Sequence, residues 1–329
     1  MKNPARYTWR MFSIGGSPKR PASILLVTFT ALSIATACGP GFRPPLHPVY
    51  DNAELDPMAA EIRLDVPYRT DAAADPHKHR LDLFLPQGQG WPMLVFVHGG
   101  SLEKGDTAQR LAGHDIYRNI GRFYSARGVG VALINYRLQP DVNWADQADD
   151  VATAVAWLTP QLEELGSDGR LFLSGHSAGA WLVGHVALDS AIQTRHGVDP
   201  DAITEVISIS GSGFDLADEL TWELFGREEV WKRRFSIEPG DLHWKERASI
   251  IPHLEADSPP FLLLYSSDEW PALIRQNRLM CQALASTDAG CRLEEIQGSG
   301  HRRMVLAMSH PDKPLTSRIL ETLVPDGTP

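Results

Sequence analysis

A serine between two glycines is the strongest chemical signal in this sequence. Gly175, Ser177 and Gly179 form the pattern G-x-S-x-G, preceded by the apolar run 170–174 and followed by the apolar stretch 178–190. A nucleophile on a strained strand-to-helix turn requires small neighbours, because the backbone is crowded there. The pattern and its position therefore predict that Ser177 is a nucleophile between a strand and a helix.

A serine hydroxyl is a weak nucleophile and requires a base. His301 lies in the segment GSGHRRM, shortly after the segment 292–296, which we expect to be the last core strand. His310 lies further from that strand, in a Ser-His-Pro turn. We therefore expect His301 to be the base, in the loop after the last strand.

The base in turn requires an acid that orients its ring and stabilises the imidazolium. Asp268 and Glu269 both follow the predicted strand 261–265. Spacing favours Glu269, which is four residues beyond Tyr265, whereas residue type favours Asp268, because Asp is the commoner acid. Both carboxylates remain candidates at this point.

Backbone N–H groups must also point to where negative charge develops on the substrate. Ala178 follows the nucleophile directly, and Gly99, Gly100 and Ser101 follow the apolar run 93–97. Consecutive glycines let a backbone approach a ligand closely. We expect an oxyanion hole formed by Ala178 and by this loop, with Gly100 or Ser101 as the second donor.

The elements that would position these residues alternate along the chain. The segments 61–66 and 80–85 alternate apolar and polar residues, which predicts strands with one wet face. Continuous apolar runs at 93–97 and 129–134 predict strands buried on both faces. We expect further core strands at 170–174, 203–209, 261–265 and 292–296. Helical spacing predicts a helix at 145–158, and we expect further helices at 178–190 and 272–285. Strands alternating with helices predict an α/β fold with a mostly parallel central sheet flanked by helices.

The segment 212–258 interrupts this alternation. It contains Trp222, Trp231 and Trp244 among many charges and has no clear strand pattern. We expect a small helical lid that helps to build the acyl pocket, since insertions of this kind commonly carry specificity. The alternative is a surface excursion that its tryptophans anchor to the body.

Composition excludes several classes of protein. The 329 residues include 31 Lys and Arg against 41 Asp and Glu, for a net charge of −10. Such an acidic chain is a poor binder of a phosphate backbone, so we expect no nucleic-acid partner. The three cysteines are too few for a disulfide scaffold or a Cys-rich zinc module. We expect a globular body over 61–325 with no metal site.

The N-terminal segment has the form of an export signal. Residues 1–20 carry basic side chains without an acid, and residues 21–37 are apolar or small. The end of this segment, before Cys38, resembles a bacterial lipobox, so we expect a lipoprotein-type signal at 1–37, a lipid on Cys38 and a Pro-rich tether at 38–60. This predicts an exported protein at the periplasmic or cell-envelope face, held to a membrane by that lipid. An uncleaved anchor, or cleavage after Ala37 that leaves a free Cys38, are the alternatives.

The other two cysteines lie close together in the chain. Cys281 and Cys291 are separated by nine residues, between a predicted helix and the last predicted strand. In an exported protein they could form a disulfide. The alternative is a pair of free buried thiols.

Several segments together resemble a known family. VFVHGGS, INYRLQP, LSGHSAGA and the late acid and histidine are similar to the esterase/lipase group of α/β-hydrolases, in particular its hormone-sensitive-lipase-like and kynurenine-formamidase-like carboxylesterases. The resemblance implies the chain order serine, acid, histidine, and the use of no cofactor. Glu269-Trp270-Pro271 followed by Arg275-Gln276-Asn277 is similar to the formamidase-like branch, which favours Glu269. Ser101 stands where the family pattern has a third glycine.

We therefore expect a serine hydrolase that cleaves carboxylic esters of small molecules through a triad and an acyl-enzyme. An arylformamidase or other amidase with the same triad is the first alternative. A non-catalytic binding member of the fold is the second, and the presence of serine, acid and histidine together argues against it.

Overall fold

A computed structural model of the chain describes residues 59–111, 113–298 and 300–325. The predicted signal at 1–37, Cys38 and nearly all of the predicted tether lie outside the described residues. Within the described part, no helix is both long enough and apolar enough to cross a bilayer.

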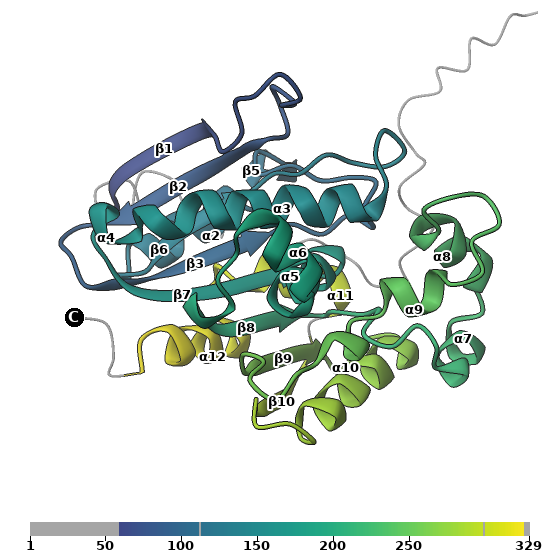
Figure 1. Cartoon of the computed structure of the whole chain (residues 1–329). Helices are drawn as coiled ribbons and strands as arrows, with labels where there is room; N and C mark the ends of the chain where they lie inside the picture. Colours follow the sequence, from purple (N-terminus) through teal and green to yellow (C-terminus); the bar gives the residue numbers. More distant parts are fainter. Residues whose placement is uncertain (1–58, 112, 299, 326–329) are drawn as a thin grey trace, which may run out of the picture. The chain divides into compact units, whose positions relative to one another are not determined.

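A twisted sheet forms the centre of the fold (Figure 1). In the described residues it has eight strands in the order β1-β2-β6-β3-β7-β8-β9-β10. The strands are β1 (Ala59–Pro67), β2 (Arg80–Pro86), β3 (Trp91–Val97), β6 (Gly130–Ile134), β7 (Ser167–His176), β8 (Ile203–Ile209), β9 (Phe261–Ser266) and β10 (Cys291–Ile296); a separate hairpin pairs β4 (Arg110–Leu111) with β5 (His114–Asp115). All pairs from β6 to β10 are parallel, and β2 is antiparallel to both β1 and β6. The predicted mostly parallel sheet is confirmed.

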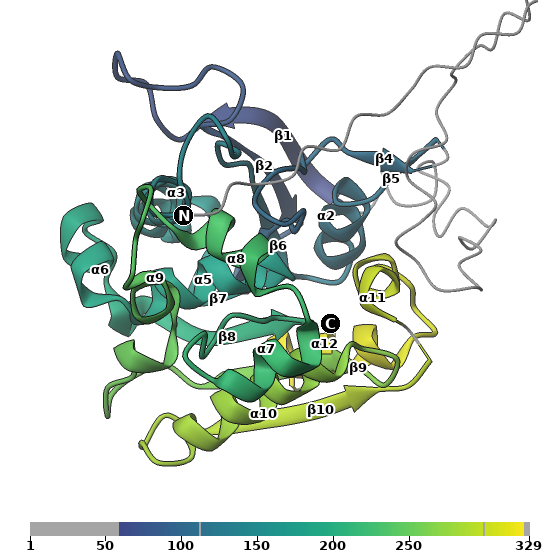
Figure 2. The ribbon, with the colours of Figure 1, turned by 90° about the vertical axis from the view of Figure 1, so that its right-hand side faces the viewer.

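Helices cover both faces of the sheet (Figures 1 and 2). One apolar core lies under α3 (Trp144–Leu158), α5 (Ala178–Leu188) and α10 (Pro271–Leu284). The other lies under α2 (Arg118–Ser125), α11 (His301–Ala307) and α12 (Pro314–Leu323). The short helices α4 (Leu162–Leu165) and α6 (Ser190–His196) complete the crossovers. Burial on both sides explains the continuous apolar runs of the central strands.

Strand β2 differs from the expectation of one wet face. After Arg80 every residue of β2 is buried, because Leu83 packs into one core and Phe84 into the other. The polar residue of this strand, Asp82, is buried as well; its carboxylate accepts hydrogen bonds from Arg118 Nε (2.8 Å) and from the Asp65 backbone N–H (2.8 Å). The polar position in this alternating pattern, Asp82, therefore belongs to a buried ion pair and not to a solvent-exposed face.

The segment between β8 and β9 contains α7 (Glu219–Phe225), α8 (Glu228–Phe235) and α9 (Trp244–Ala248), which appear in green beside α10 in Figure 1. Its aromatic side chains pack into the body. The ring of Phe235 lies 4.8 Å from that of Trp181 on α5, and Trp222 and Trp244 are buried. An ion pair between Arg275 on α10 and Asp218 at the start of α7 (2.5 Å) ties the segment to α10.

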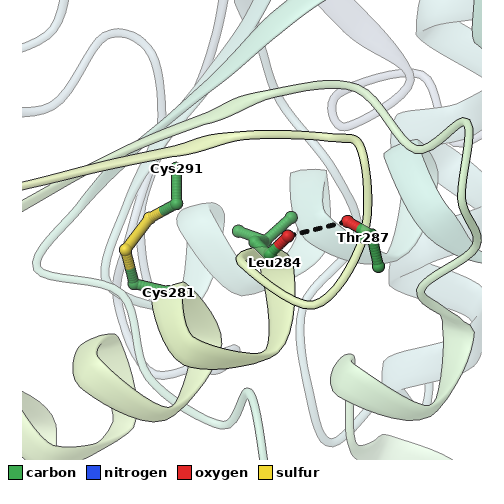
Figure 3. Close-up of a disulfide and its surroundings, with 4 residues drawn as sticks. All are labelled: Cys281, Leu284, Thr287 and Cys291. Atoms are coloured by element: carbon green, nitrogen blue, oxygen red, sulfur yellow. Dashed lines mark hydrogen bonds between the residues drawn. A yellow bond between two sulfur atoms is a disulfide. The ribbon is translucent and has the colours of Figure 1, made fainter.

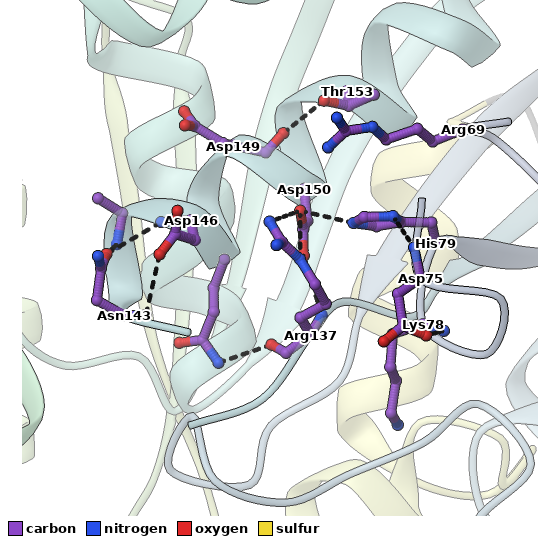
Figure 4. Close-up of polar contacts among 12 residues, drawn as sticks. Arg69, Asp75, Lys78, His79, Arg137, Asn143, Asp146, Asp149, Asp150 and Thr153 are labelled. Carbon is purple, nitrogen blue, oxygen red and sulfur yellow. Dashed lines mark hydrogen bonds and ion pairs between the residues drawn. The ribbon is translucent and has the colours of Figure 1, made fainter. Parts of the chain in front are cut away.

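A buried ion-pair network holds the loops that lead to α3 (Figure 4). The Asp150 carboxylate accepts hydrogen bonds from Arg137 Nη2 (2.7 Å) and from His79 Nε2 (2.9 Å). His79 Nδ1 accepts from the Asp75 backbone N–H (2.8 Å), which leaves the proton on Nε2. The network is fully partnered, as a buried charge requires.

Helix α10 and strand β10 are joined covalently (Figure 3). Cys281 and Cys291 form a disulfide, with their Cα atoms 5.5 Å apart. In the connecting turn the Thr287 hydroxyl donates to the Leu284 carbonyl (2.8 Å). The disulfide closes a short loop between α10, which follows Glu269, and β10, which precedes His301.

Candidate active site

The carboxyl ends of β3, β7, β9 and β10 meet at one edge of the sheet and bring the predicted residues together. Ser177 follows β7 directly, Glu269 follows β9, and His301 begins α11 after β10. His301 Nε2 lies 2.9 Å from Ser177 Oγ, and Nδ1 lies 3.0 Å from Glu269 Oε2. The hydroxyl, imidazole and carboxylate therefore form one hydrogen-bonded series, across 124 residues of sequence between Ser177 and His301.

The turn that presents Ser177 is strained. Its φ of 55° and ψ of −118° belong to a conformation that L-residues rarely adopt. The Ser177 N–H donates to the Ile209 carbonyl at the end of β8 (2.9 Å). Glycine is required on both sides: a Cβ on Gly175 would lie 2.3 Å from Gly179 C, and one on Gly179 would lie 2.0 Å from the Val97 carbonyl oxygen.

The two candidate acids have opposite surroundings. The Glu269 side chain is fully buried and faces His301, whereas Asp268 is exposed. The Trp270 N–H donates to Glu269 Oε1 (3.2 Å), which helps to fix the carboxylate. Glu269 is thus the carboxylate that the fold places on His301, and Asp268 is not brought to the site.

The loop that carries His301 is fastened to the loop that carries Glu269. The Ser266 hydroxyl at the end of β9 accepts from the Gly300 N–H (2.6 Å), and the Ser267 hydroxyl accepts from the Gly298 N–H (3.0 Å). These two serines hold the base at a fixed distance from the acid. The sequence contains no signal for this role beyond their position after a strand.

The glycine loop after β3 lies against the nucleophile. A Cβ on Gly99 would lie 2.7 Å from the His176 carbonyl oxygen and 3.2 Å from Ser177 Cβ, so glycine is required for this approach. Gly100, Ser101 and Leu102 have φ values of 125°, 58° and 68°, which turn the backbone sharply. Ala178, the other expected donor, is the first residue of α5, where backbone N–H groups point out of the helix end.

Bonds from α3 and its leading loop fix this glycine loop. The Leu102 carbonyl accepts from Gln147 Nε2 (2.8 Å) and from the Gln139 N–H (2.9 Å). His98 Nδ1 donates to the Gly99 carbonyl (2.8 Å), and burial lowers the pKa of His98 to about 4. His98 is therefore a neutral side chain that holds the loop.

His176 contributes to the geometry in a way that the motif alone does not predict. Its Nε2 donates to the backbone carbonyl of His301 (2.9 Å), and the two rings are 4.9 Å apart. Burial and the neighbouring His301 lower the pKa of His176 to about 3. The neutral ring thus fixes the start of α11 from beneath the nucleophile.

An apolar pocket lies near this series of residues, between α7, α8 and α10. About 230 Å³ of space, part of it open to solvent, lies among these helices. Its lining is mostly aromatic and aliphatic and consists of Ser212, Gly213, Leu216, Thr221, Trp222, Phe225, Trp231, Ala272, Leu273 and Gln276. The Phe225 ring lies 6.3 Å from that of Trp270, which lies 5.1 Å from that of His301. Trp270 therefore stands between the pocket and the base.

Comparison with known proteins places the chain in a family. A family model described as BD-FAE matches residues 81–284, which include the oxyanion loop, Ser177 and Glu269. The chain belongs to the BD-FAE family. The match ends before His301, whose position beside Ser177 and Glu269 is given by the distances above.

Individual relatives agree with this family. The BD-FAE chain is 24% identical over 255 residues to a probable isoprenylcysteine alpha-carbonyl methylesterase of Arabidopsis thaliana (72% of this chain, 51% of the relative). It is 28% identical over 218 residues to Esterase LipC of Mycobacterium tuberculosis (64% and 52%). The chain thus spans about half the length of these curated relatives.

A solved structure supports the fold. Esterase B from Lactobacillus rhamnosis superposes with a TM-score of 0.64 at 21% identity, covering 80% of this BD-FAE chain and 84% of that one. Together with the parallel sheet and its helices, this shows the α/β-hydrolase fold that the sequence motifs predicted.

Proposed function

We propose that this protein hydrolyses carboxylic esters of small molecules through Ser177, His301 and Glu269. The hydrogen-bonded series from Ser177 Oγ through His301 to the buried Glu269 carboxylate carries this proposal. The family match and the esterase relatives support it. No step requires a cofactor.

The mechanism follows from which atoms can hold the proton. Glu269 accepts from His301 Nδ1–H, so the lone pair of Nε2 faces the Ser177 hydroxyl. His301 takes that proton as Ser177 Oγ bonds to the ester carbonyl carbon. The resulting oxyanion is stabilised by the Ala178 N–H and by an N–H of the Gly99–Ser101 loop. His301 then gives its proton to the leaving alcohol, and Ser177 is left acylated. Water gives a proton to His301 as it attacks the acyl carbonyl carbon, and His301 returns that proton to Ser177 Oγ as the acid leaves.

The position of the apolar pocket supports a substrate with an apolar group. Trp270 and Phe225 connect the pocket to His301, and the pocket wall is formed largely by the 212–231 segment. We infer that this pocket receives the acyl chain or another apolar part of the ester.

The test compares the full-length chain with Ser177→Ala on p-nitrophenyl acetate. We expect kcat/KM to fall at least about 10³-fold in the variant, because the nucleophile is lost. A fluorophosphonate probe should add covalently to the wild type only, as seen by intact mass. Equal turnover or equal labelling of a folded Ser177→Ala protein would refute the proposal.

Matched substrates separate the alternatives. A formanilide turned over faster than its matched ester would assign the protein to the amidase class. A folded wild type that neither turns over the ester nor takes the probe would favour a binding role.

We further propose that the protein is exported and anchored by a lipid on Cys38. The basic and apolar segments of residues 1–37 support this, and the Cys281–Cys291 disulfide suits an oxidising compartment. The intact mass of the mature protein from a bacterial host tests it. A chain that retains residues 1–37, or that begins at an unmodified Cys38, would contradict it.

A further inference from the structure

A second cluster of ligating side chains lies at the far end of the helix that begins behind the nucleophile. His185 and Asp189 lie at the end of α5, and His253 ends the short 3-10 helix η4 (Ile251–His253), between α9 and β9. One potential ligand atom from each of the three lies within 4.8 Å of the others. Among the described residues this is the one group of three or more His, Cys, Asp or Glu side chains with such spacing.

His185 has the tautomer of a metal-binding histidine, and one of its ring nitrogens lacks a hydrogen-bond partner. It is fully buried, and its Nε2 donates to the Ala248 carbonyl (3.3 Å). The lone pair is therefore on Nδ1, which is buried without a hydrogen-bond partner. Ligating histidines commonly donate their other N–H to a carbonyl in this way.

Asp189 is held in a fixed orientation with one oxygen available. Its Oδ1 accepts from the Ala191 N–H (2.9 Å), capping α6, and its Oδ2 lies 3.8 Å from His253 Nε2. The side chains of Asp189 and His253 are 16% and 28% exposed, so an ion can reach them from solvent.

We propose that His185, Asp189 and His253 bind one divalent transition-metal ion, for which Zn²⁺ is the probe. Two imidazoles and a carboxylate are donors that Zn²⁺ accepts, and a water would complete a tetrahedral set. Pairing of Asp189 with a protonated His253 is the metal-free alternative, but it leaves His185 Nδ1 unpartnered. The metal-bound arrangement satisfies all three side chains.

The role that follows is structural. His185 is eight residues beyond Ser177, about 12 Å along the helix, so the ion would not contact the reacting atoms. It would join the end of α5 to η4, through which the 212–258 segment returns to the sheet. The expectation of no metal site rested on the small number of cysteines; this group has no spacing motif in the sequence, since His253 is distant in the chain.

The test uses the full-length chain without a polyhistidine tag, stripped with a chelator and dialysed against Zn²⁺. We expect one Zn²⁺ per chain and, at 100 times the Kd, a rise in Tm of about 5 °C. Ca²⁺, which prefers oxygen ligands, should give no such rise.

Matched variants locate the ion. His253→Gln and Asp189→Asn should each weaken Zn²⁺ binding at least tenfold, and Asn at position 189 retains the cap of α6. His243→Gln alters a 76% exposed histidine near α9 and should bind like the wild type. Any Zn²⁺ bound by the Cys38 thiol instead would be bound equally by the wild type and the three variants. Absence of bound Zn²⁺ in the wild type, or equal affinity in all of them, would overturn the proposal.

Discussion

Two adjacent carboxylates show how the surroundings of a residue decide its role. Glu269 is buried and bonded to His301, whereas Asp268 points to solvent. We expect Glu269→Gln to lower kcat about 10³- to 10⁴-fold, because the amide cannot stabilise the imidazolium that forms. Asp268→Asn should change kcat by less than about twofold, since a solvated charge is largely screened. Steady-state kinetics on p-nitrophenyl acetate measure both, and a large loss in Asp268→Asn would contradict the assignment.

The sequence predicts part of the site at this scale. Ser177 and His301 could be predicted, because a motif and a position after a strand are local properties of the chain. The choice between Asp268 and Glu269 could not be made from residue type and spacing, since it depends on which side chain turns inward. The bond from His176 to the His301 carbonyl depends on a contact between residues 125 positions apart, which no local pattern contains.

At the scale of elements, α7 and α8 form much of the wall of the apolar pocket near His301. Phe225 lines the pocket and lies between Trp231 and Trp270. We expect Phe225→Ala to lower kcat/KM about tenfold for p-nitrophenyl hexanoate relative to the acetate, because apolar contacts to the longer chain are lost. Leu242→Ala, at an 81% exposed position of the same segment, is the control. Equal losses on both esters would show that the pocket does not receive the acyl chain.

The elements themselves follow the sequence where apolar runs are strong. The run 203–209 is a strand with the predicted bounds, and 145–158 forms all but the first residue of α3. The predicted helix 178–190 ends at Leu188 instead, because the Asp189 side chain caps a new helix, α6. Helix α2 was not predicted, because it has few apolar positions.

At the scale of the whole molecule, buried histidines make stability depend on pH. Burial lowers the pKa values of His98, His176 and His185 to about 4, 3 and 4, below the value of about 6.5 in an unfolded chain. Between these folded-state pKa values and about pH 6.5, the three histidines bind more protons in the unfolded state than in the folded state. The stabilisation from their neutral forms is therefore fully present above about pH 6.5 and is lost as the pH falls. Each histidine contributes up to about 1.4 kcal/mol per pH unit.

We therefore expect the free energy of unfolding in urea to be clearly lower at pH 5 than at pH 7, with a chelator present so that no metal contributes. His176→Gln should reduce the slope, because one of the three proton-binding groups is removed. A flat profile between pH 7 and pH 5 would contradict the prediction.

The long separation between Ser177 and His301 also has a consequence for synthesis of the protein. A chain that grows from its N-terminus completes β7, the glycine loop and the strained serine well before His301 is added. The serine therefore has no histidine partner until residue 301 has been added and α11 has formed. Nascent chains or clipped products that end before α11 would present the serine and the glycine loop without the histidine, and we expect them not to hydrolyse esters.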